Sequence, residues 1–169
     1  LAMGDALAVA LINKKCFNTT DFRKIHPGGA LGQRLSSRVE DIMLTSESVP
    51  YINEEATMED AVEEINRRGF GVTFVINAKQ ILVGIITDGD LRRLIGKKKS
   101  IFEIPVKDVM TKNPRRVSPG SPVYDALNMM EQYQITVLPV IDSAGKVLGI
   151  LHLHDILGKG EFKFNGNLI

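Results

Sequence analysis

The chain has 169 residues, of which 44% are hydrophobic and 24% are charged, and this suits one medium domain or two small, closely packed ones with a hydrophobic core. Its 21 Lys and Arg residues against 20 Asp and Glu leave a net charge of +1, which excludes a broad electrostatic surface for nucleic acid or an anionic membrane. The single cysteine, Cys16, excludes an internal disulfide, and no apolar run reaches membrane-spanning length, so we expect a cytoplasmic protein.

The first 35 residues differ from everything that follows them. The chain opens with Leu1 and not with methionine, inside a stretch, residues 1–12, that is apolar on nearly every side of a helix. Such a helix is built to be buried, and we interpret it as part of a longer protein. A turn-rich stretch, residues 17–35, follows and contains the sequence His26-Pro-Gly-Gly.

From residue 36 onwards the chain contains an internal repeat. The early part of the unit recurs after 67 positions and the later part after 65, so two residues are missing from a loop of the second copy. The matched pairs are Asp41 with Asp108, Met43 with Met110, Gly84 with Gly149 and Asp90 with Asp155.

Each copy predicts the same order of elements. A short extended stretch leads to a helix, then to two strands joined by a polar turn, and then to a second helix, which is roughly β-α-β-β-α. Thr57 caps the first helix of copy one, and Ser121-Pro122 opens that of copy two with proline at the first helical position. The predicted extended segments are 49–52, 72–76 and 82–86, then 115–118, 137–141 and 147–151, and the closing helices begin near Asp90 and Asp155.

This pattern resembles the CBS family, whose modules pair into a flat disc with two ligand clefts. The most specific elements are Gly84-Ile-Ile-Thr87-Asp-Gly-Asp90 and its repeat, Gly149-Ile-Leu-His152-Leu-His-Asp155. The resemblance implies an α/β (α+β) fold of tandem CBS repeats packed as a pseudo-twofold pair, because neither copy can bury both sheet faces alone. We expect residues 36–100 and 101–158 to form the two modules and residues 159–169 to form a tail.

The first copy suits a nucleotide. An ionised Asp90 at a helix start can accept hydrogen bonds from both hydroxyls of a ribose, and Thr87 can donate to a phosphate beside the helix N-terminus. Gly84 would let the backbone come close to the base. The alternative is that Asp90 is only a helix cap and Thr87 only a strand end. Arg92 and Arg93 follow Asp90 in the same helix and can bind a phosphate, and of the two we assign Arg92 to the site.

The second copy departs from the family pattern at His152, where threonine or serine is usual. A histidine can contact a phosphate or carboxylate, more firmly when protonated, so this cleft, with Asp155, can prefer a different ligand. If the strand continues, His152 and His154 lie on one side of it, but no cysteine cluster completes a metal site, and we predict none. The pair Arg115-Arg116 lies after Met110-Thr111, where CBS pairs commonly contact their ligand, and of the two we assign Arg116 to the site.

The opening segment and the sequence His26-Pro-Gly-Gly look like the end of the sugar isomerase domain of the D-arabinose 5-phosphate isomerase family, in which a CBS pair follows directly. Residues 1–35 would then be the remnant and linker of an upstream isomerase domain. The resemblance implies that the parent converts D-ribulose 5-phosphate into D-arabinose 5-phosphate for the lipopolysaccharide sugar Kdo. It assigns a catalytic role to His26 in the full-length parent alone, so we expect this chain to be inactive by itself.

Three classes of function follow. The first is a regulatory binding module, which requires no cofactor and takes a regulatory nucleotide such as AMP or ATP, or the nucleotide-sugar CMP-Kdo. The second is an autonomous enzyme, for which no convergent nucleophile, base and anion site is visible. The third is a structural oligomerisation module without a ligand, or the CBS pair of another sugar-phosphate isomerase. As partners we expect the upstream isomerase domain and a second copy, in a dimer or tetramer.

Overall fold

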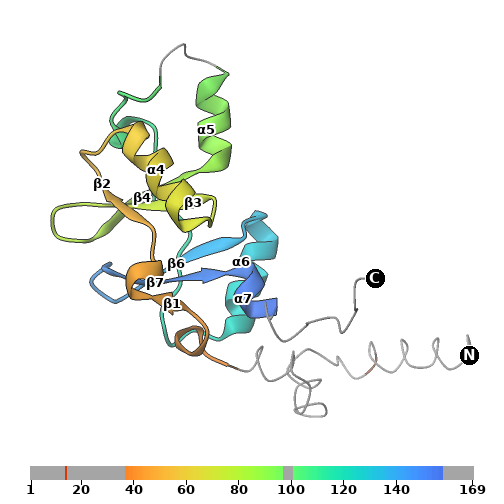
Figure 1. The fold of residues 1–169 in the computed structure, drawn as a ribbon. Coiled ribbons are helices and arrows are strands. Elements are labelled where there is room, and N and C mark those ends of the chain that lie inside the picture. The colour runs from red at the N-terminus through yellow and green to blue at the C-terminus, as the bar shows by residue number, and fades with distance from the viewer. Residues whose placement is uncertain (1–13, 15–36, 97–100, 158–169) are drawn as a thin grey trace, which may run out of the picture.

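The computed structural model describes residue 14 and residues 37–96 and 101–157 (Figure 1). The predicted helix 1–12, Cys16 and His26 lie outside the described residues. From the first copy come η1 (Val39–Asp41), β1 (Leu44–Thr45), η2 (Ser46–Ser48), β2 (Tyr51–Asn53), α4 (Met58–Arg68), β3 (Val72–Ile76), β4 (Leu82–Thr87) and α5 (Asp88–Ile95). From the second come η3 (Val106–Asp108), β5 (Thr111–Lys112), α6 (Val123–Tyr133), β6 (Val137–Ile141), β7 (Val147–His152) and α7 (Leu153–Leu157).

The strands form two sheets, in the orders β2-β3-β4-β5 and β1-β7-β6. In both sheets the hairpin of one copy carries at its edge a short strand from the other copy. β1 pairs antiparallel with β7, with Leu44 opposite Ile150, and β5 pairs antiparallel with β4, with Thr111 opposite Ile85. The predicted α/β fold of two repeated units is confirmed, but each sequence repeat gives its first short strand to the other sheet.

Glycines permit this exchange. A Cβ on Gly84 would lie 2.4 Å from Sδ of Met110, which arrives with β5. A Cβ on Gly149 would lie 2.7 Å from the backbone oxygen of Leu44 and 3.0 Å from Sδ of Met43, which arrives with β1. The repeated Gly and Met are therefore packing partners across the two copies. The predicted role of Gly84, to let a base approach, stays a prediction; in this structure Met110 packs against Gly84, and Gly84 does not line the first cleft described below.

Capping residues begin the helices. Thr57 caps α4 and forms a reciprocal capping box with Asp60, as predicted. α5 begins two residues earlier than Asp90, and Thr87 is its cap. Pro122, predicted at the first helical position of α6, is instead the N-cap residue with extended backbone angles.

The structure shows where the second copy is two residues shorter than the first. Ser46 and Asn113 both have positive φ, of 55° and 51°, and mark the same turn at the 67-residue spacing. Beyond the turn, Ile52 pairs parallel with Val75 and Val117 makes a parallel bridge to Val140, at the 65-residue spacing. The first copy thus has two extra residues in the crossover that contains η2. In the second copy, the predicted extended stretch 115–118 is not a strand and contributes an isolated bridge at Val117.

The core joins both sheets into one body. One buried cluster contains residues of β3 and β4 together with residues of β6 and β7: Val72, Phe74, Leu82, Val137 and Ile150, with Val49 of the crossover. The two hairpin turns also touch, through a bridge between Ile81 and Lys146. In Figure 1 the helices α4 and α5 flank the first sheet, and α6 and α7 flank the second. The prediction that two copies pack together is confirmed.

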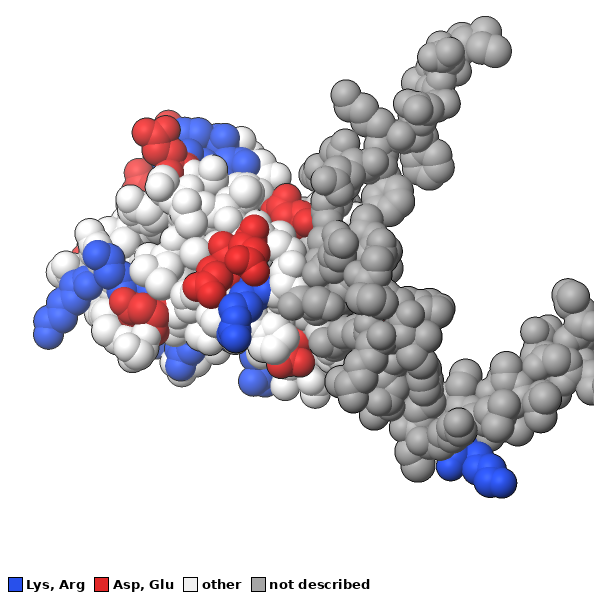
Figure 2. Space-filling model, turned by 90° about the horizontal axis from the view of Figure 1, so that it is seen from below, with Lys and Arg blue, Asp and Glu red and all other residues white. Residues whose placement is uncertain are grey.

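The described surface carries mixed charge. On the face shown in Figure 2, acidic and basic side chains lie interspersed over the described part of the molecule. Within residues 37–96 and 101–157, no helix is long and apolar enough to cross a membrane.

Candidate functional site

A cavity of about 490 Å³ lies where the end of β4 and the start of α5 meet the loop after β5 and the start of β6. We call it the first cleft. Its volume lies in the range of small-molecule sites, which is about 300–1,000 Å³. Its walls come from both sequence copies, as the strand exchange requires. It is lined by Phe70, Gly71, Val72, Ile85, Thr87, Asp88, Gly89, Asp90, Arg92, Arg93, Thr111, Pro114, Arg115, Gln134, Ile135, Thr136 and Val137.

Thr87 and Asp90 lie together in the first cleft and bind each other. The Thr87 hydroxyl donates to Asp90 Oδ2 at 2.7 Å, and the Thr87 backbone N–H donates to the same oxygen at 2.9 Å. The Asp90 N–H donates back to Thr87 Oγ1 at 3.2 Å. Asp90 Oδ1 accepts from Arg93, and Asp90 is only 8% exposed. Thr87, and not Asp90, is the cap, and Asp90 is its reciprocal partner at the third helical position.

Three arginines line the first cleft, which gives it an excess of positive charge over Asp88 and Asp90. Arg92 was assigned to the site from the sequence, and Arg93 and Arg115, each adjacent in sequence to an assigned arginine, line the cleft with it. The guanidinium of Arg115 lies over the ring of Tyr133, 3.9 Å from its centroid, which fixes its position. The predicted Arg116 is exposed and is not a lining residue. Neighbouring side chains of an extended chain point to opposite sides, so which arginine faces the cleft depends on the path of the backbone.

The second copy places His152 and Asp155 at the matching position. His152 ends β7, and its ring lies 5.9 Å from that of Phe70 and 4.9 Å from that of His154. The strand does not continue: His154 is already in α7, and its N–H points to His152 Nδ1 at 3.4 Å. Asp155 Oδ2 is buried and has no hydrogen-bond partner in the part of the chain that the structure describes. Asp90 Oδ2 obtains two donors from Thr87, whereas no described hydrogen bond supplies Asp155 Oδ2.

No metal cluster forms within the described part of the chain. Across residues 37–96 and 101–157, three or more His, Cys, Asp or Glu side chains do not gather at one place. His26, the predicted catalytic residue of the parent, lies outside the described residues.

Comparisons with known proteins agree with the repeat. Residues 39–97 and 106–160 match the family described as CBS domain. The chain is 44% identical over 160 residues to arabinose 5-phosphate isomerase KdsD of Salmonella typhi, covering 95% of this chain and 48% of that protein. It is 40% identical over 157 residues to KdsD of Francisella tularensis, covering 93% of this chain and 48% of that protein. The chain thus spans about half the length of the curated relatives it matches.

Solved structures share the fold. The crystal structure of CBSX2 in complex with AMP superposes with a TM-score of 0.61 at 27% identity, covering 71% of this chain and 92% of that one.

Proposed function

The chain belongs to the CBS domain family, and from this premise we propose that it is the regulatory, ligand-binding pair of an arabinose 5-phosphate isomerase. The identity to KdsD proteins over 95% of the chain supports the parent enzyme. In that parent, an upstream isomerase domain interconverts D-ribulose 5-phosphate and D-arabinose 5-phosphate for Kdo and lipopolysaccharide synthesis, with His26 as a catalytic residue. The chain by itself has no turnover.

The observation that carries this proposal is the first cleft. It combines a buried carboxylate, Asp90, with three guanidinium groups, those of Arg92 and Arg93 on α5 and that of Arg115 in the loop after β5. The positive end of the α5 dipole also favours an anion. This is a donor and acceptor set for a nucleotide, whose ribose offers hydroxyl donors and whose phosphate carries negative charge. AMP in the related CBSX2 structure supports an adenine nucleotide.

Ligand binding then requires Asp90 to change partners. In the described state its two oxygens accept from Thr87 and Arg93. A ribose replaces one of these contacts, and Arg93 becomes available to the phosphate. Because β4, α5, β5 and β6 all line the cleft, occupancy stabilises the junction between the two sheets. The ligand thereby biases the shape that the pair presents to the isomerase domain, which is linkage between two sites.

The matching position of the second copy, at His152 and Asp155, extends the proposal to a second cleft. Among the described residues Asp155 Oδ2 is buried without a donor, and a ligand hydroxyl would supply one. His152 at the threonine position makes this cleft different, so the two clefts select different ligands. AMP, ATP, CMP and CMP-Kdo are the candidates, and no cofactor is required.

The test is calorimetric titration of the chain with AMP. The loss of a charge-assisted hydrogen bond costs about 1.5–3 kcal/mol, so Asp90→Asn should weaken binding about 10- to 150-fold. This substitution also damages a helix cap, and α4 offers a matched control, because Asp60 forms the same capping box with Thr57 away from the first cleft. Asp60→Asn disturbs the same kind of capping box at an exposed helix start and should leave the affinity unchanged.

Two outcomes of these titrations would contradict the proposal. If none of AMP, ATP, CMP and CMP-Kdo produces binding heat, the regulatory proposal is wrong, and the chain is an oligomerisation module. If Asp60→Asn weakens binding as much as Asp90→Asn, Asp90 acts through helix stability and does not contact the ligand.

A further inference from the structure

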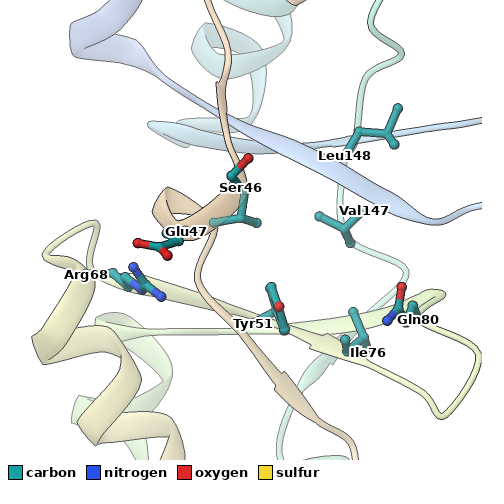
Figure 3. Close-up of a pocket in the computed structure, with 9 residues that line it drawn as sticks. Ser46, Glu47, Tyr51, Arg68, Ile76, Gln80, Val147 and Leu148 are labelled. Atoms are coloured by element: carbon teal, nitrogen blue, oxygen red, sulfur yellow. The ribbon is translucent and has the colours of Figure 1, made fainter.

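A second cavity of about 490 Å³ lies beside the crossover from β1 to β2 and shares no lining residue with the first cleft. We call it the crossover cavity (Figure 3). Its walls come from both sheets: β2 and the β3–β4 hairpin on one side, and β7 on the other. It is lined by Ser46, Glu47, Val49, Tyr51, Arg68, Ile76, Gln80, Val147 and Leu148.

One wall of the crossover cavity is specific to the first copy. This wall is η2, which belongs to the segment with two extra residues and has no counterpart among the elements of the second copy. At the 65-residue spacing, Tyr133 stands at the position that corresponds to Arg68, and it is covered there by Arg115. The crossover cavity therefore depends on a feature specific to the first copy.

Its interior is apolar at the base and polar around it. Val49 is 4% exposed and, with Ile76 and Val147, supplies aliphatic surface. Tyr51 and Leu148 are 53% and 36% exposed, so an aromatic ring and a leucine stand uncovered at the opening. These surfaces fit a compact ring or a short hydrocarbon body, whose burial would remove them from water.

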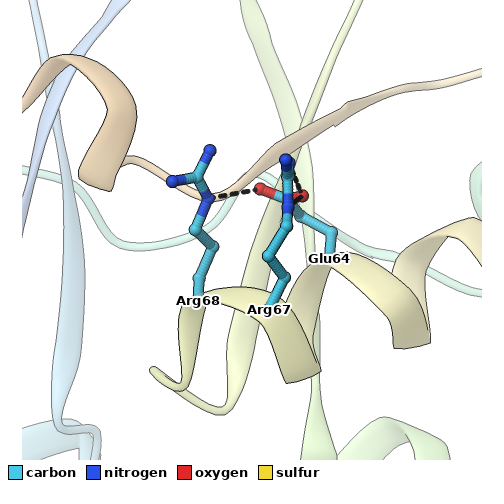
Figure 4. A network of polar contacts seen from close by, with 3 residues as sticks. All are labelled: Glu64, Arg67 and Arg68. Atoms are coloured by element: carbon cyan, nitrogen blue, oxygen red, sulfur yellow. Dashed lines mark hydrogen bonds and ion pairs between the residues drawn. The ribbon is translucent and has the colours of Figure 1, made fainter.

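Arg68 supplies a cation that is held in place. Glu64, only 6% exposed, accepts a hydrogen bond from Arg68 Nε at 3.1 Å and also pairs with Arg67 (Figure 4). This contact fixes the guanidinium through its inner nitrogen, and its two terminal nitrogens point away from Glu64. Within the described part of the chain, those two nitrogens have no hydrogen bond or ion pair. Two terminal N–H groups in a plane match the two oxygens of a carboxylate.

We propose that the crossover cavity is a third ligand site, for a small monocarboxylate with a hydroxyl or amino group on a compact ring or aliphatic body. Arg68 binds the carboxylate, and Tyr51 and Leu148 cover the body. Gln80, at the opposite end of the cavity from Arg68 in Figure 3, accepts from the hydroxyl or amino group. Glu47, on the same side as Arg68, disfavours a doubly charged phosphate. Glu64 is a positioning residue that acts through Arg68. This site is independent of the nucleotide clefts.

The test is an NMR titration of the isotopically labelled chain with 4-hydroxybenzoate. The uncharged 4-hydroxybenzyl alcohol and inorganic phosphate serve as comparison probes. The benzoate should shift amide signals of the crossover cavity, above all those of Ser46, Tyr51 and Gln80, and the other two probes should not. Arg68→Met should weaken this binding about tenfold or more, because it keeps the stem and removes both donors.

Arg67→Met is the matched control, because Arg67 pairs with the same Glu64 but does not line the cavity. It should leave benzoate binding unchanged. If Arg68→Met does not fold, Tyr51→Ser replaces it, since Tyr51 is largely exposed, and the expected result is again weaker binding. AMP titration of Arg68→Met should match wild type, which separates this proposal from that of the nucleotide clefts.

Three results would overturn the proposal. The first is the absence of localised shifts with the benzoate. The second is equal binding of the alcohol, or of the benzoate to both arginine variants. The third is a shift of the same signals with protein concentration alone, which would assign this surface to a second copy of the chain.

Discussion

Within residues 37–96 and 101–157, two buried polar side-chain atoms, Thr73 Oγ1 and Asp155 Oδ2, lack a hydrogen-bond partner. Their settings differ. Thr73 is fully buried in β3, with buried apolar neighbours on either side in sequence, Val72 and Phe74, whereas Asp155 stands at the position that matches the ribose-binding candidate Asp90. A buried polar atom without a partner costs stability, so it persists where a ligand can satisfy it or where packing tolerates it. We interpret Asp155 as the first case and Thr73 as the second.

Thr73→Val tests this interpretation at the residue scale. Valine has nearly the same shape as threonine and no hydroxyl to desolvate, so the free energy of unfolding should rise by about 1 kcal/mol. Equilibrium urea denaturation gives the value. The reverse change in the same strand, Val75→Thr, buries a new hydroxyl at a fully buried position and should cost about 1–3 kcal/mol. A loss of stability in Thr73→Val would show that its hydroxyl has a partner in solution.

At the scale of elements, the same threonine–aspartate capping box occurs at the starts of two helices. Thr57 with Asp60 and Thr87 with Asp90 form the same capping box at the starts of α4 and α5. The first is a solvent-exposed cap, and the second lines the first cleft. A helix-start motif that satisfies backbone N–H groups therefore also places a carboxylate and a hydroxyl where a ligand can reach them. At α5 the same pair of side chains therefore caps the helix and faces the first cleft.

The stability that the exposed cap at Thr57 and Asp60 contributes should depend on pH. Hydrogen bonds from the backbone and then the side chain of Thr57 hold the pKa of Asp60 below its ordinary value of 3.8. A lowered pKa in the folded state means that the cap stabilises the protein above the unfolded pKa and that this stabilisation is lost as pH falls through the folded pKa. Wild type should therefore exceed Asp60→Asn in unfolding free energy at about pH 5, and the gap should shrink by about pH 2.5. Urea denaturation at both pH values measures the gap, and a constant gap would contradict the assignment.

At the scale of the whole molecule, the strand exchange makes the two repeats one body. β1 completes the sheet of β6 and β7, and β5 completes the sheet of β2, β3 and β4. Each exchanged strand pairs with a strand position occupied by glycine. β1 pairs at Gly149 and packs Met43 against it, and β5 pairs at Gly84 and packs Met110 against it. The contacts differ in kind, because the Cβ of an alanine would meet a backbone oxygen first at Gly149 and a flexible side chain first at Gly84.

This difference predicts unequal effects of two matched substitutions. Gly149→Ala would press against the Leu44 backbone oxygen and push β1 off β7, with an expected cost of about 1–3 kcal/mol. Gly84→Ala should cost less, and Met110→Ala in the same chain should restore much of the loss. Met43→Ala should not rescue Gly149→Ala. Urea denaturation of the single and double variants decides it, and equal rescue at both sites would contradict the backbone clash.

Much of the local structure could be predicted from the sequence. The capping pattern at Thr57, the strands Val72–Ile76 and Val137–Ile141, and the helices after each hairpin follow from residue propensity, periodicity and turn residues within a few positions. The repeat itself predicted two units that pack together, because one unit alone leaves apolar surface exposed. The same local pattern placed Thr87, Asp90 and Arg92 in the first cleft.

Only the tertiary structure decided what depends on contacts between distant segments. The exchange of β1 and β5 determines which sheet each short strand completes, and it packs the Met110 side chain against Gly84. The path of the chain after β5 brings Arg115 and not Arg116 into the first cleft, and η2 brings Ser46 and Glu47 to the wall of the crossover cavity. Propensity and periodicity act over one or two turns of chain, whereas these features arise where backbones far apart in sequence pack within van der Waals distance.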